Sequence, residues 1–229
     1  LANDPRPIIG SIRNPWDWYI SLWGYGCDRK GALYHRVTST KSWWFDLIFA
    51  PGYAFRSLPI QLKKPRQLWR NSYRSVDDPQ AFREWLYLLC NHDRQREMAE
   101  GYDRTSLSTF AGLMTFRYLR LFGRDVANLF EQPDSFKSAA DLAAFDREQN
   151  MLTGTIRNEQ LEDDFIKVLT QCGVQLSDEQ IATIRGSKKT NTSSRKRSVE
   201  YYYDRDTLEL IKHRDQFIIE KYGYATPSL

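Results

Sequence analysis

The chain has 229 residues, of which 41% are hydrophobic and 27% charged, and this composition excludes a fully disordered chain or a fibre. The formal net charge of +4 is too small to indicate nucleic-acid binding by itself. The three cysteines are far apart and form no C-x-x-C pair, which argues against a disulfide scaffold and a structural zinc site. No run of 18 apolar residues is present, so no transmembrane helix is expected.

The first predicted elements are a strand, a polar turn and a helix. A short buried strand is predicted over 7–12, because its isoleucines are β-branched and its prolines oppose a helix. Asn14 is a good helix cap, and Pro15 suits the first position of a helix, so a helix is predicted over 16–23. A Gly-rich loop is expected over 24–30.

The middle of the chain is predicted to be mostly helical. Residues 31–68 mix aromatic residues with Gly and Pro, and we expect mostly loop with short helical pieces there. Apolar spacing then predicts helices over 79–91, capped by Asp78, over 108–122 and over 138–147.

The last third of the chain predicts a second strand followed by helices. The strand spans 152–156, and a polar, basic loop spans 186–198. Strands that alternate with helices are typical of an α/β layer fold. The predicted helices lie over 161–172, from the Ser177 cap to 184, where Gln180 completes a capping box, and over 204–222.

Arg13 and Ser21 are the sharpest candidates for ligand binding. Arg13 follows the first strand, at the carboxyl end where α/β proteins bind ligands. Ser21 comes eight residues later, about two turns along the helix. Arg13 can donate two N–H bonds to a phosphate, and Ser21 can donate its hydroxyl. The alternative interpretation is that Arg13 pairs with a carboxylate and Ser21 is only buried.

The segment I-R-N-P-W-D-W-Y-I-S over 12–21 resembles the 3′-phosphate-binding segment of sulfotransferases. These enzymes take the sulfuryl group from 3′-phosphoadenosine 5′-phosphosulfate. The amino-acid sequence of this segment looks especially like that of the bacterial, carbohydrate-type branch of the family. The resemblance implies that Arg13 and Ser21 contact the 3′-phosphate of the donor. The aromatic residues Trp16, Trp18 and Tyr19 match in type and are interpreted as packing residues.

Two further segments resemble the same family. Residues 155–165 are similar to its strand-to-helix element R-x-E-x-L-x-x-D-F, where Glu159 is interpreted as structural because a carboxylate suits a helix start. The C-terminal part is similar to a basic loop that folds over the nucleotide, a Y-Y-D helix start at 202–204, and a final Gly223-Tyr224. This resemblance implies further donor contacts from Asn191, Ser193, Arg195 and Lys196.

The basic loop also suggests anion binding on its own chemistry. Five cations fall within 188–197 without an acid between them. A mobile basic lid would raise the affinity for a donor that carries several negative charges. The alternatives are a solvated surface loop and a nucleic-acid or localisation patch.

The resemblance implies a P-loop NTPase-like, three-layer α/β fold, with a central parallel sheet flanked by helices in one domain over 1–229. It further implies an aromatic segment over 26–75 near the acceptor cleft and a lid over 186–198. The family's first strand and phosphosulfate loop precede the R-N-P strand, and no G-x-x-x-x-G-K-[ST] motif occurs in this sequence. We therefore expect an N-terminally incomplete chain, or else a pseudoenzyme.

The catalytic base is expected before Leu1, where the family carries its usual His or Glu. Of the three histidines, His35 is the best candidate, because its loop is expected to border the acceptor cleft. His92 and His213 are interpreted as surface or structural residues, and the scheme requires no metal. Aromatic residues between 25 and 69 either offer flat faces to sugar rings or pack as a hydrophobic subdomain, namely Trp43, Trp44, Phe45, Tyr53 and Phe55.

The sequence thus predicts a sulfotransferase that moves a sulfuryl group from 3′-phosphoadenosine 5′-phosphosulfate to a hydroxyl of a carbohydrate or another hydroxylated metabolite. The alternatives are a non-catalytic nucleotide-binding or scaffold protein of the same fold and a basic nucleic-acid-binding domain. A nucleic-acid partner is not expected, and a homodimer is left open. Cysteine usage and a cytosolic donor suggest a cytoplasmic protein, with a lumenal enzyme as the alternative.

Overall fold

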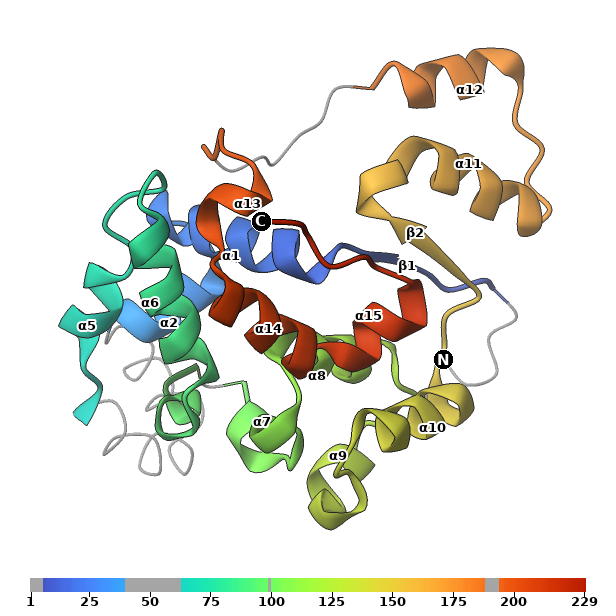
Figure 1. Cartoon of the computed structure of the whole chain (residues 1–229). Coiled ribbons are helices and arrows are strands. Elements are labelled where there is room, and N and C mark those ends of the chain that lie inside the picture. Colours follow the sequence, from blue (N-terminus) through green and yellow to red (C-terminus); the bar gives the residue numbers. More distant parts are fainter. Residues whose placement is uncertain (1–5, 40–62, 99, 188–193) are drawn as a thin grey trace, which may run out of the picture.

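The computed structural model describes residues 6–39, 63–98, 100–187 and 194–229. Within them the chain is mostly helical with one small sheet, so the protein is broadly α/β. Strands β1 (Ile9–Ile12) and β2 (Gly154–Arg157) pair in parallel, as predicted (Figure 1). In their register Ile12 is opposite Arg157. Because parallel strands end at the same edge, the turns after β1 and β2 lie close together. The sheet of the described residues has these two strands, fewer than the central sheet of the expected three-layer fold.

Helix α1 (Pro15–Cys27) begins as predicted and ends later than predicted. The side chain of Asn14 accepts hydrogen bonds from the first turn, and Pro15 opens the helix. The expected Gly-rich loop over 24–30 is wrong, since Gly24 and Gly26 both lie within the helix. A Cβ on Gly26 would lie 2.3 Å from the ring of Tyr73, so this glycine permits close packing of helix against ring.

The hydrophobic core surrounds α1. Helix α6 (Pro79–Cys90), α13 (Val199–Tyr202) and α14 (Arg205–Arg214) pack against it. Buried aromatic rings meet edge to face across these helices, as between Trp23 and Phe82, whose centroids are 5.4 Å apart. The contact of α1 with these helices is rich in large buried side chains that exclude water, including Trp16, Tyr19, Trp23, Trp85, Tyr202 and Tyr203.

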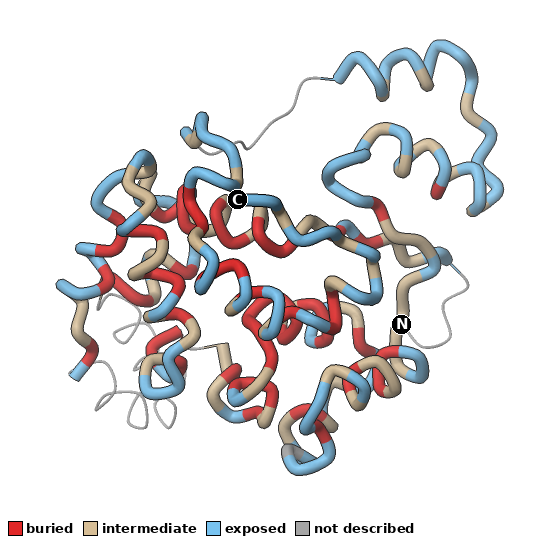
Figure 2. Tube along the Cα trace, viewed as in Figure 1, coloured by how far each residue is buried: buried red, intermediate tan, exposed pale blue. Residues whose placement is uncertain are grey.

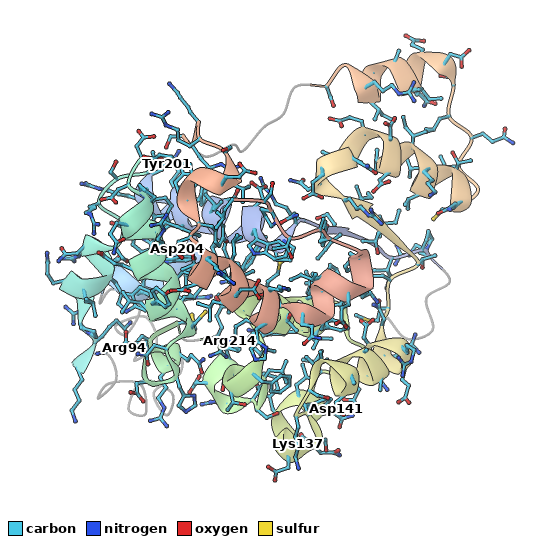
Figure 3. All side chains as sticks on the ribbon, viewed as in Figure 1. Arg94, Lys137, Asp141, Tyr201, Asp204 and Arg214 are labelled. Carbon is cyan, nitrogen blue, oxygen red and sulfur yellow. The ribbon has the colours of Figure 1, made fainter. Side chains whose placement is uncertain are left out.

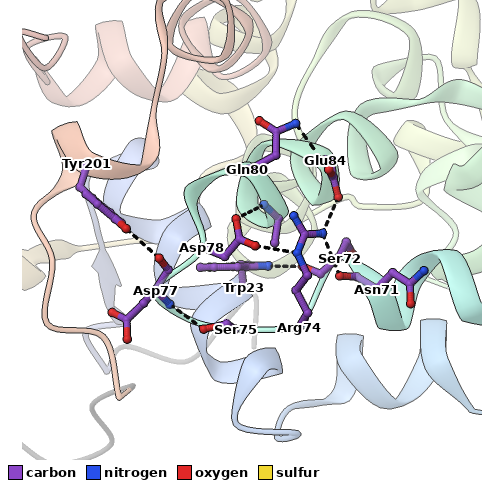
Figure 4. Close-up of polar contacts among 11 residues, drawn as sticks. Trp23, Asn71, Ser72, Arg74, Ser75, Asp77, Asp78, Gln80, Glu84 and Tyr201 are labelled. Atoms are coloured by element: carbon purple, nitrogen blue, oxygen red, sulfur yellow. Dashed lines mark hydrogen bonds and ion pairs between the residues drawn. The ribbon is translucent and has the colours of Figure 1, made fainter.

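The turn before α6 connects three elements (Figure 4). Asp78 caps α6 with its side chain, as predicted. The indole of Trp23, on α1, donates to the backbone oxygen of Ser72 at 2.7 Å. The hydroxyl of Tyr201, on α13, donates to the backbone oxygen of Asp77 at 2.7 Å. The C-terminal segment is thereby fixed on the N-terminal half of the chain.

Smaller helices complete the main body. Helix α2 (Ala32–Thr38) and α5 (Arg66–Asn71) pack together beyond the C-terminal end of α1. Two short helices, α7 (Leu107–Phe110) and α9 (Asn128–Glu131), flank α8 (Leu113–Phe122). The remaining elements here are η1 (His92–Met98), η2 (Tyr102–Arg104), η3 (Pro133–Ser135) and α10 (Ala139–Gln149).

Two helices that the sequence predicts as continuous are broken. The one predicted over 108–122 divides into α7 and α8, and the one over 204–222 divides into α14 and α15 (Gln216–Tyr222) at Asp215. The two breaks meet, because the backbone N–H of Gly112 donates to the oxygen of Arg214 at 2.6 Å. A Cβ on Gly112 would lie 2.3 Å from the Asp215 carboxylate, so only glycine fits beside it.

Helices α11 (Leu161–Gln171) and α12 (Asp178–Arg185) stand apart from the main body (Figure 1). They join it through the turn η4 (Asn158–Gln160) and β2. Most of their surface is exposed, and Val168 is the one buried residue of the two helices (Figure 2). The predicted capping box between Ser177 and Gln180 is confirmed.

Candidate functional site

Three segments that are distant in the sequence meet at the carboxyl ends of β1 and β2. The backbone N–H of Asn14 donates to Glu159 Oε1 at 2.6 Å. The Tyr224 hydroxyl lies 3.5 Å from Glu159 Oε2, and burial together with the charge of Glu159 raises the pKa of Tyr224. Glu159 thus has the structural role that was predicted, although it joins strand ends in addition to preceding a helix.

Arg13 leaves the end of β1 and pairs with Asp17, one turn further on in α1. Its Nε donates to Asp17 Oδ2, and the two side chains are 31% and 18% exposed. The alternative interpretation, in which Arg13 pairs with a carboxylate, is therefore correct as far as the pairing is concerned, and Asp17 is that carboxylate. The other N–H groups of Arg13 have no hydrogen-bond partner among the described residues, so the guanidinium can still donate to a ligand.

Arg195 reaches the same carboxylate from the other end of the chain. Its Nη2 lies 2.5 Å from Asp17 Oδ1, and its side chain is 18% exposed. Its Nη1 is buried and has no hydrogen-bond partner within the described part of the chain. One carboxylate therefore holds two guanidinium groups side by side and leaves the cluster with a net positive charge.

The residue before Arg195 is bound further along the same helix. The Ser194 hydroxyl donates to Asp28 Oδ1 at 2.6 Å, and its N–H donates to Oδ2 at 3.3 Å. Asp17 lies in the first turn of α1, and Asp28 caps its C-terminal end 11 positions later, about three helical turns, so both lie at the same face of the helix. Ser21 lies between them near that face, half-buried, and its hydroxyl bonds to none of the described residues.

The structure brings together only some of the predicted donor-binding residues. Arg13 and Arg195 meet at Asp17, and Ser21 lies about one turn further along α1. Lys196 is exposed and has no partner among the described residues. Asn191 and Ser193 lie outside the described residues, as do all of residues 188–193 of the basic lid.

The prediction that His35 lies in a loop is wrong, since it belongs to α2. Its ring is exposed and packs edge-on against Tyr34, with centroids 5.4 Å apart. Helix α2 packs on α5 and η1. These contacts do not place His35 near Arg13, which precedes the other end of α1. The surface interpretation of the other two histidines agrees with the exposure of His92 and His213.

Two tyrosines before α14, Tyr202 and Tyr203, attach the chain after the basic segment, Ser194–Arg197, to the core. The hydroxyl of Tyr203 donates to the backbone oxygen of Trp16 at 2.9 Å, in a buried position. Asp204 caps α14 through a capping box with Thr207, which confirms the predicted helix start at Y-Y-D (Figure 3). The residues that follow the basic segment in the chain are therefore anchored on the core.

A polar hollow of about 490 Å³ lies between β2 and α11. Arg157, Gln160 and Lys167 are among the residues that line it. One lining residue, Arg157, is opposite Ile12 in the sheet, and Ile12 directly precedes Arg13 in the chain. Its lining can donate to and accept from hydroxyl groups.

The aromatic acceptor residues proposed from the sequence fall outside the described residues. Within the described residues, Trp69 is fully buried and donates to the carboxylate of Glu97, so it belongs to the core. No group of three or more His, Cys, Asp or Glu side chains in the described ranges is arranged to hold a metal ion. None of the helices described combines the length and apolar character needed to cross a membrane.

Sequence reasoning missed Asp17 and Asp28. Asp17 was detectable, because it lies four residues after Arg13, in the first turn of the helix that follows, which is a common spacing for an ion pair. Asp28 carries no such signal, since its partner Ser194 is 166 residues away.

The comparisons with known proteins give no relative. No protein-family model matches the chain, and searches of curated proteins and of solved structures return no significant match.

Proposed function

We propose that this chain binds 3′-phosphoadenosine 5′-phosphosulfate and is a sulfotransferase that acts on a hydroxyl of a carbohydrate or another hydroxylated acceptor. One observation supports this most strongly. Arg13 and Arg195 converge on one carboxylate beside Ser21, at the carboxyl end of a parallel strand. The resemblance assigns Arg13 and Ser21 to the 3′-phosphate of the donor, and Arg195 to the basic loop that folds over the nucleotide.

The chemistry of the cluster suits a phosphate. Guanidinium groups form strong charge-assisted bonds to phosphate oxygens, and the start of a helix favours an anion. Two arginines and one aspartate carry a net positive charge, so a doubly charged 3′-phosphate is attracted despite Asp17. The buried Nη1 of Arg195 would gain an acceptor on binding.

The assignment of a specific fold family is part of the same proposal. Both β1–α1 and β2–α11 are strand, turn and helix in succession, and their strands are parallel. Such units build the three-layer sheets of P-loop NTPase-like proteins, with ligands at the carboxyl ends of the strands. We therefore propose that fold, in a single domain, with the basic segment before α13 as part of the nucleotide lid.

The proposed reaction is an in-line transfer. The acceptor oxygen attacks the sulfur of the donor, a new S–O bond forms, and the bond from sulfur to the 5′-phosphate oxygen breaks. The hydroxyl proton passes to a base, and 3′-phosphoadenosine 5′-phosphate leaves. The polar hollow beside Arg157 suits the hydroxyl groups of an acceptor. No described residue is assigned as the base.

The test is a thermal-shift titration with 3′-phosphoadenosine 5′-phosphate, with AMP as the control nucleotide. At a hundredfold excess over its dissociation constant, a ligand stabilises the folded state by about 2.7 kcal/mol. We expect a shift with the bisphosphate, little shift with AMP, and loss of the difference in Arg13→Ala. The matched control is Arg185→Ala, because that arginine is 62% exposed and pairs with Asp163.

Two outcomes contradict the proposal. Equal shifts with both nucleotides would remove the 3′-phosphate site. Binding of the bisphosphate without sulfuryl transfer from the donor to any of a panel of glycans and hydroxylated metabolites would favour the non-catalytic nucleotide-binding alternative.

A further inference from the structure

We propose that Asp17 is a positioning residue of the 3′-phosphate site, an inference that rests on the proposed function. Its carboxylate holds Arg13 and Arg195 together and thereby fixes the basic segment, Ser194–Arg197, on helix α1. The nucleotide would then meet two arginines that are already in place.

The geometry shows how the carboxylate is shared. Asp17 Oδ2 accepts from Arg13 Nε, and Oδ1 accepts from Arg195 Nη2 at 2.5 Å. Each arginine therefore uses one N–H on Asp17 and keeps others for a ligand. The Nη1 of Arg195 is buried without a partner in the described part of the chain, which is an unfavourable state that a phosphate oxygen would relieve.

Charge explains why the carboxylate helps to bind an anion. Two guanidinium groups that bind the same carboxylate repel each other once that anion is removed. Before the nucleotide binds, Asp17 supplies that anion, and all three side chains are less than one-third exposed. Without Asp17, Arg195 would swing away, because its long side chain has no other hydrogen-bond partner among the described residues.

The second anchor of the basic segment provides a matched control. Asp28 holds Ser194 and forms no hydrogen bond or ion pair with Arg13 or Arg195. Loss of Asp28 should loosen the segment while Arg13 and Arg195 remain paired through Asp17. Variants at the two aspartates therefore separate the attachment of the segment from the arrangement of the arginines.

The first experiment needs no nucleotide. Trypsin cuts after Arg195, Lys196 and Arg197, so the cleavage rate there reports how firmly the segment is attached. We expect Asp17→Asn to raise this rate at least fivefold, with cleavage elsewhere unchanged. Asp17→Glu, which keeps the charge, should restore part of the protection, and Asp163→Asn, at a remote exposed pair, should behave as wild type. An unchanged rate in Asp17→Asn overturns the attachment of the segment by Asp17.

The second experiment measures dissociation constants for 3′-phosphoadenosine 5′-phosphate and AMP by calorimetry. We expect Asp17→Asn to reduce the preference for the bisphosphate at least fivefold, Asp17→Glu to recover part of it, and Asp28→Asn to retain it. A general folding defect would weaken both nucleotides alike and leave the ratio unchanged. If the wild type prefers the bisphosphate and Asp17→Asn keeps that preference, the positioning role is wrong and the proposed function stands. If the wild type shows no preference, the proposed function fails, and the phosphate role of Asp17 fails with it.

Discussion

The hydroxyl of Tyr19 donates a hydrogen bond of 2.7 Å to the carboxylate of Asp215, and both residues are fully buried. Tyr19 lies in α1, and Asp215 separates α14 from α15. The same carboxylate accepts from the N–H and the hydroxyl of Thr115, at 2.9 and 2.7 Å. Burial raises the pKa of Asp215 above its ordinary value, while its hydrogen bonds oppose the rise. One carboxylate thus connects α1, α8 and the two C-terminal helices.

Replacement of this carboxylate is predicted to destabilise the fold. Asp215→Ala leaves the Tyr19 hydroxyl and both Thr115 donors without an acceptor in the core. Because each buried donor left unsatisfied costs about 1 to 3 kcal/mol, we expect a loss of at least about 3 kcal/mol in the free energy of unfolding, measured by urea denaturation. Tyr19→Phe removes a single hydroxyl and should cost less. A loss below about 1 kcal/mol in Asp215→Ala would contradict this account.

Glu100 is predicted to make stability depend on pH on the acid side. It accepts hydrogen bonds from Arg36 at 2.7 Å and from Arg117 Nε at 2.8 Å, and its side chain is 7% exposed. Burial alone would raise the pKa of Glu100, but the hydrogen bonds and charge of Arg117, followed by the charges of Arg36 and Arg120, lower it. The folded state therefore favours the ionised carboxylate.

For a carboxylate with a lowered folded pKa, the stabilisation is full above its unfolded pKa and is lost as pH falls through the folded pKa. The unfolded value is near 4.5, so the loss begins there and continues to lower pH. Glu100→Gln should lower the free energy of unfolding by about 1 to 3 kcal/mol at pH 7 and by much less at pH 3. Denaturation at the two pH values measures this, and an equal loss at both would show that charge is not the cause.

Gly26→Ala is predicted to destabilise the protein although alanine favours helices. Helix propensity would gain about 1 kcal/mol, but the new methyl group meets the Tyr73 ring at 2.3 Å. Overpacking of a core costs about 1 to 3 kcal/mol, so a net loss in thermal stability is expected. In a Tyr73→Leu background the same substitution should cost less, and an equal cost there would exclude the ring as its cause.

Ser21→Ala is predicted to weaken the binding of 3′-phosphoadenosine 5′-phosphate less than Arg13→Ala does. A neutral hydroxyl bond contributes about 1 kcal/mol, or roughly fivefold in affinity, whereas a charged guanidinium contributes more. Affinity for AMP should be unchanged in both variants, because AMP has no 3′-phosphate. Calorimetry of the two variants with both nucleotides measures this, and an effect of Ser21→Ala on AMP would place the hydroxyl elsewhere.

The elements that sequence reasoning predicted are those whose signals are local. Asn14 and Pro15 start α1, Asp78 starts α6, and Ser177 with Gln180 starts α12 as expected. Each of these caps is completed within four residues, so the residues that decide it are adjacent in the sequence. The assignment of Arg13 and Ser21 to a phosphate is a prediction of another kind, because it rests on the resemblance of the segment 12–21 to the sulfotransferase motif.

The relationships that shape the core and the candidate site are long-range and were not predictable in this way. The breaks at Gly112 and Asp215 arise because a buried carboxylate needs room and donors from α1 and α8. Asp17 and Arg195 are 178 residues apart, and no periodicity relates them. The sequence by itself predicted both strands, the capped starts of several helices, and which residues could bind a phosphate. Tertiary structure alone decided which charges face each other, because that depends on how the helices pack.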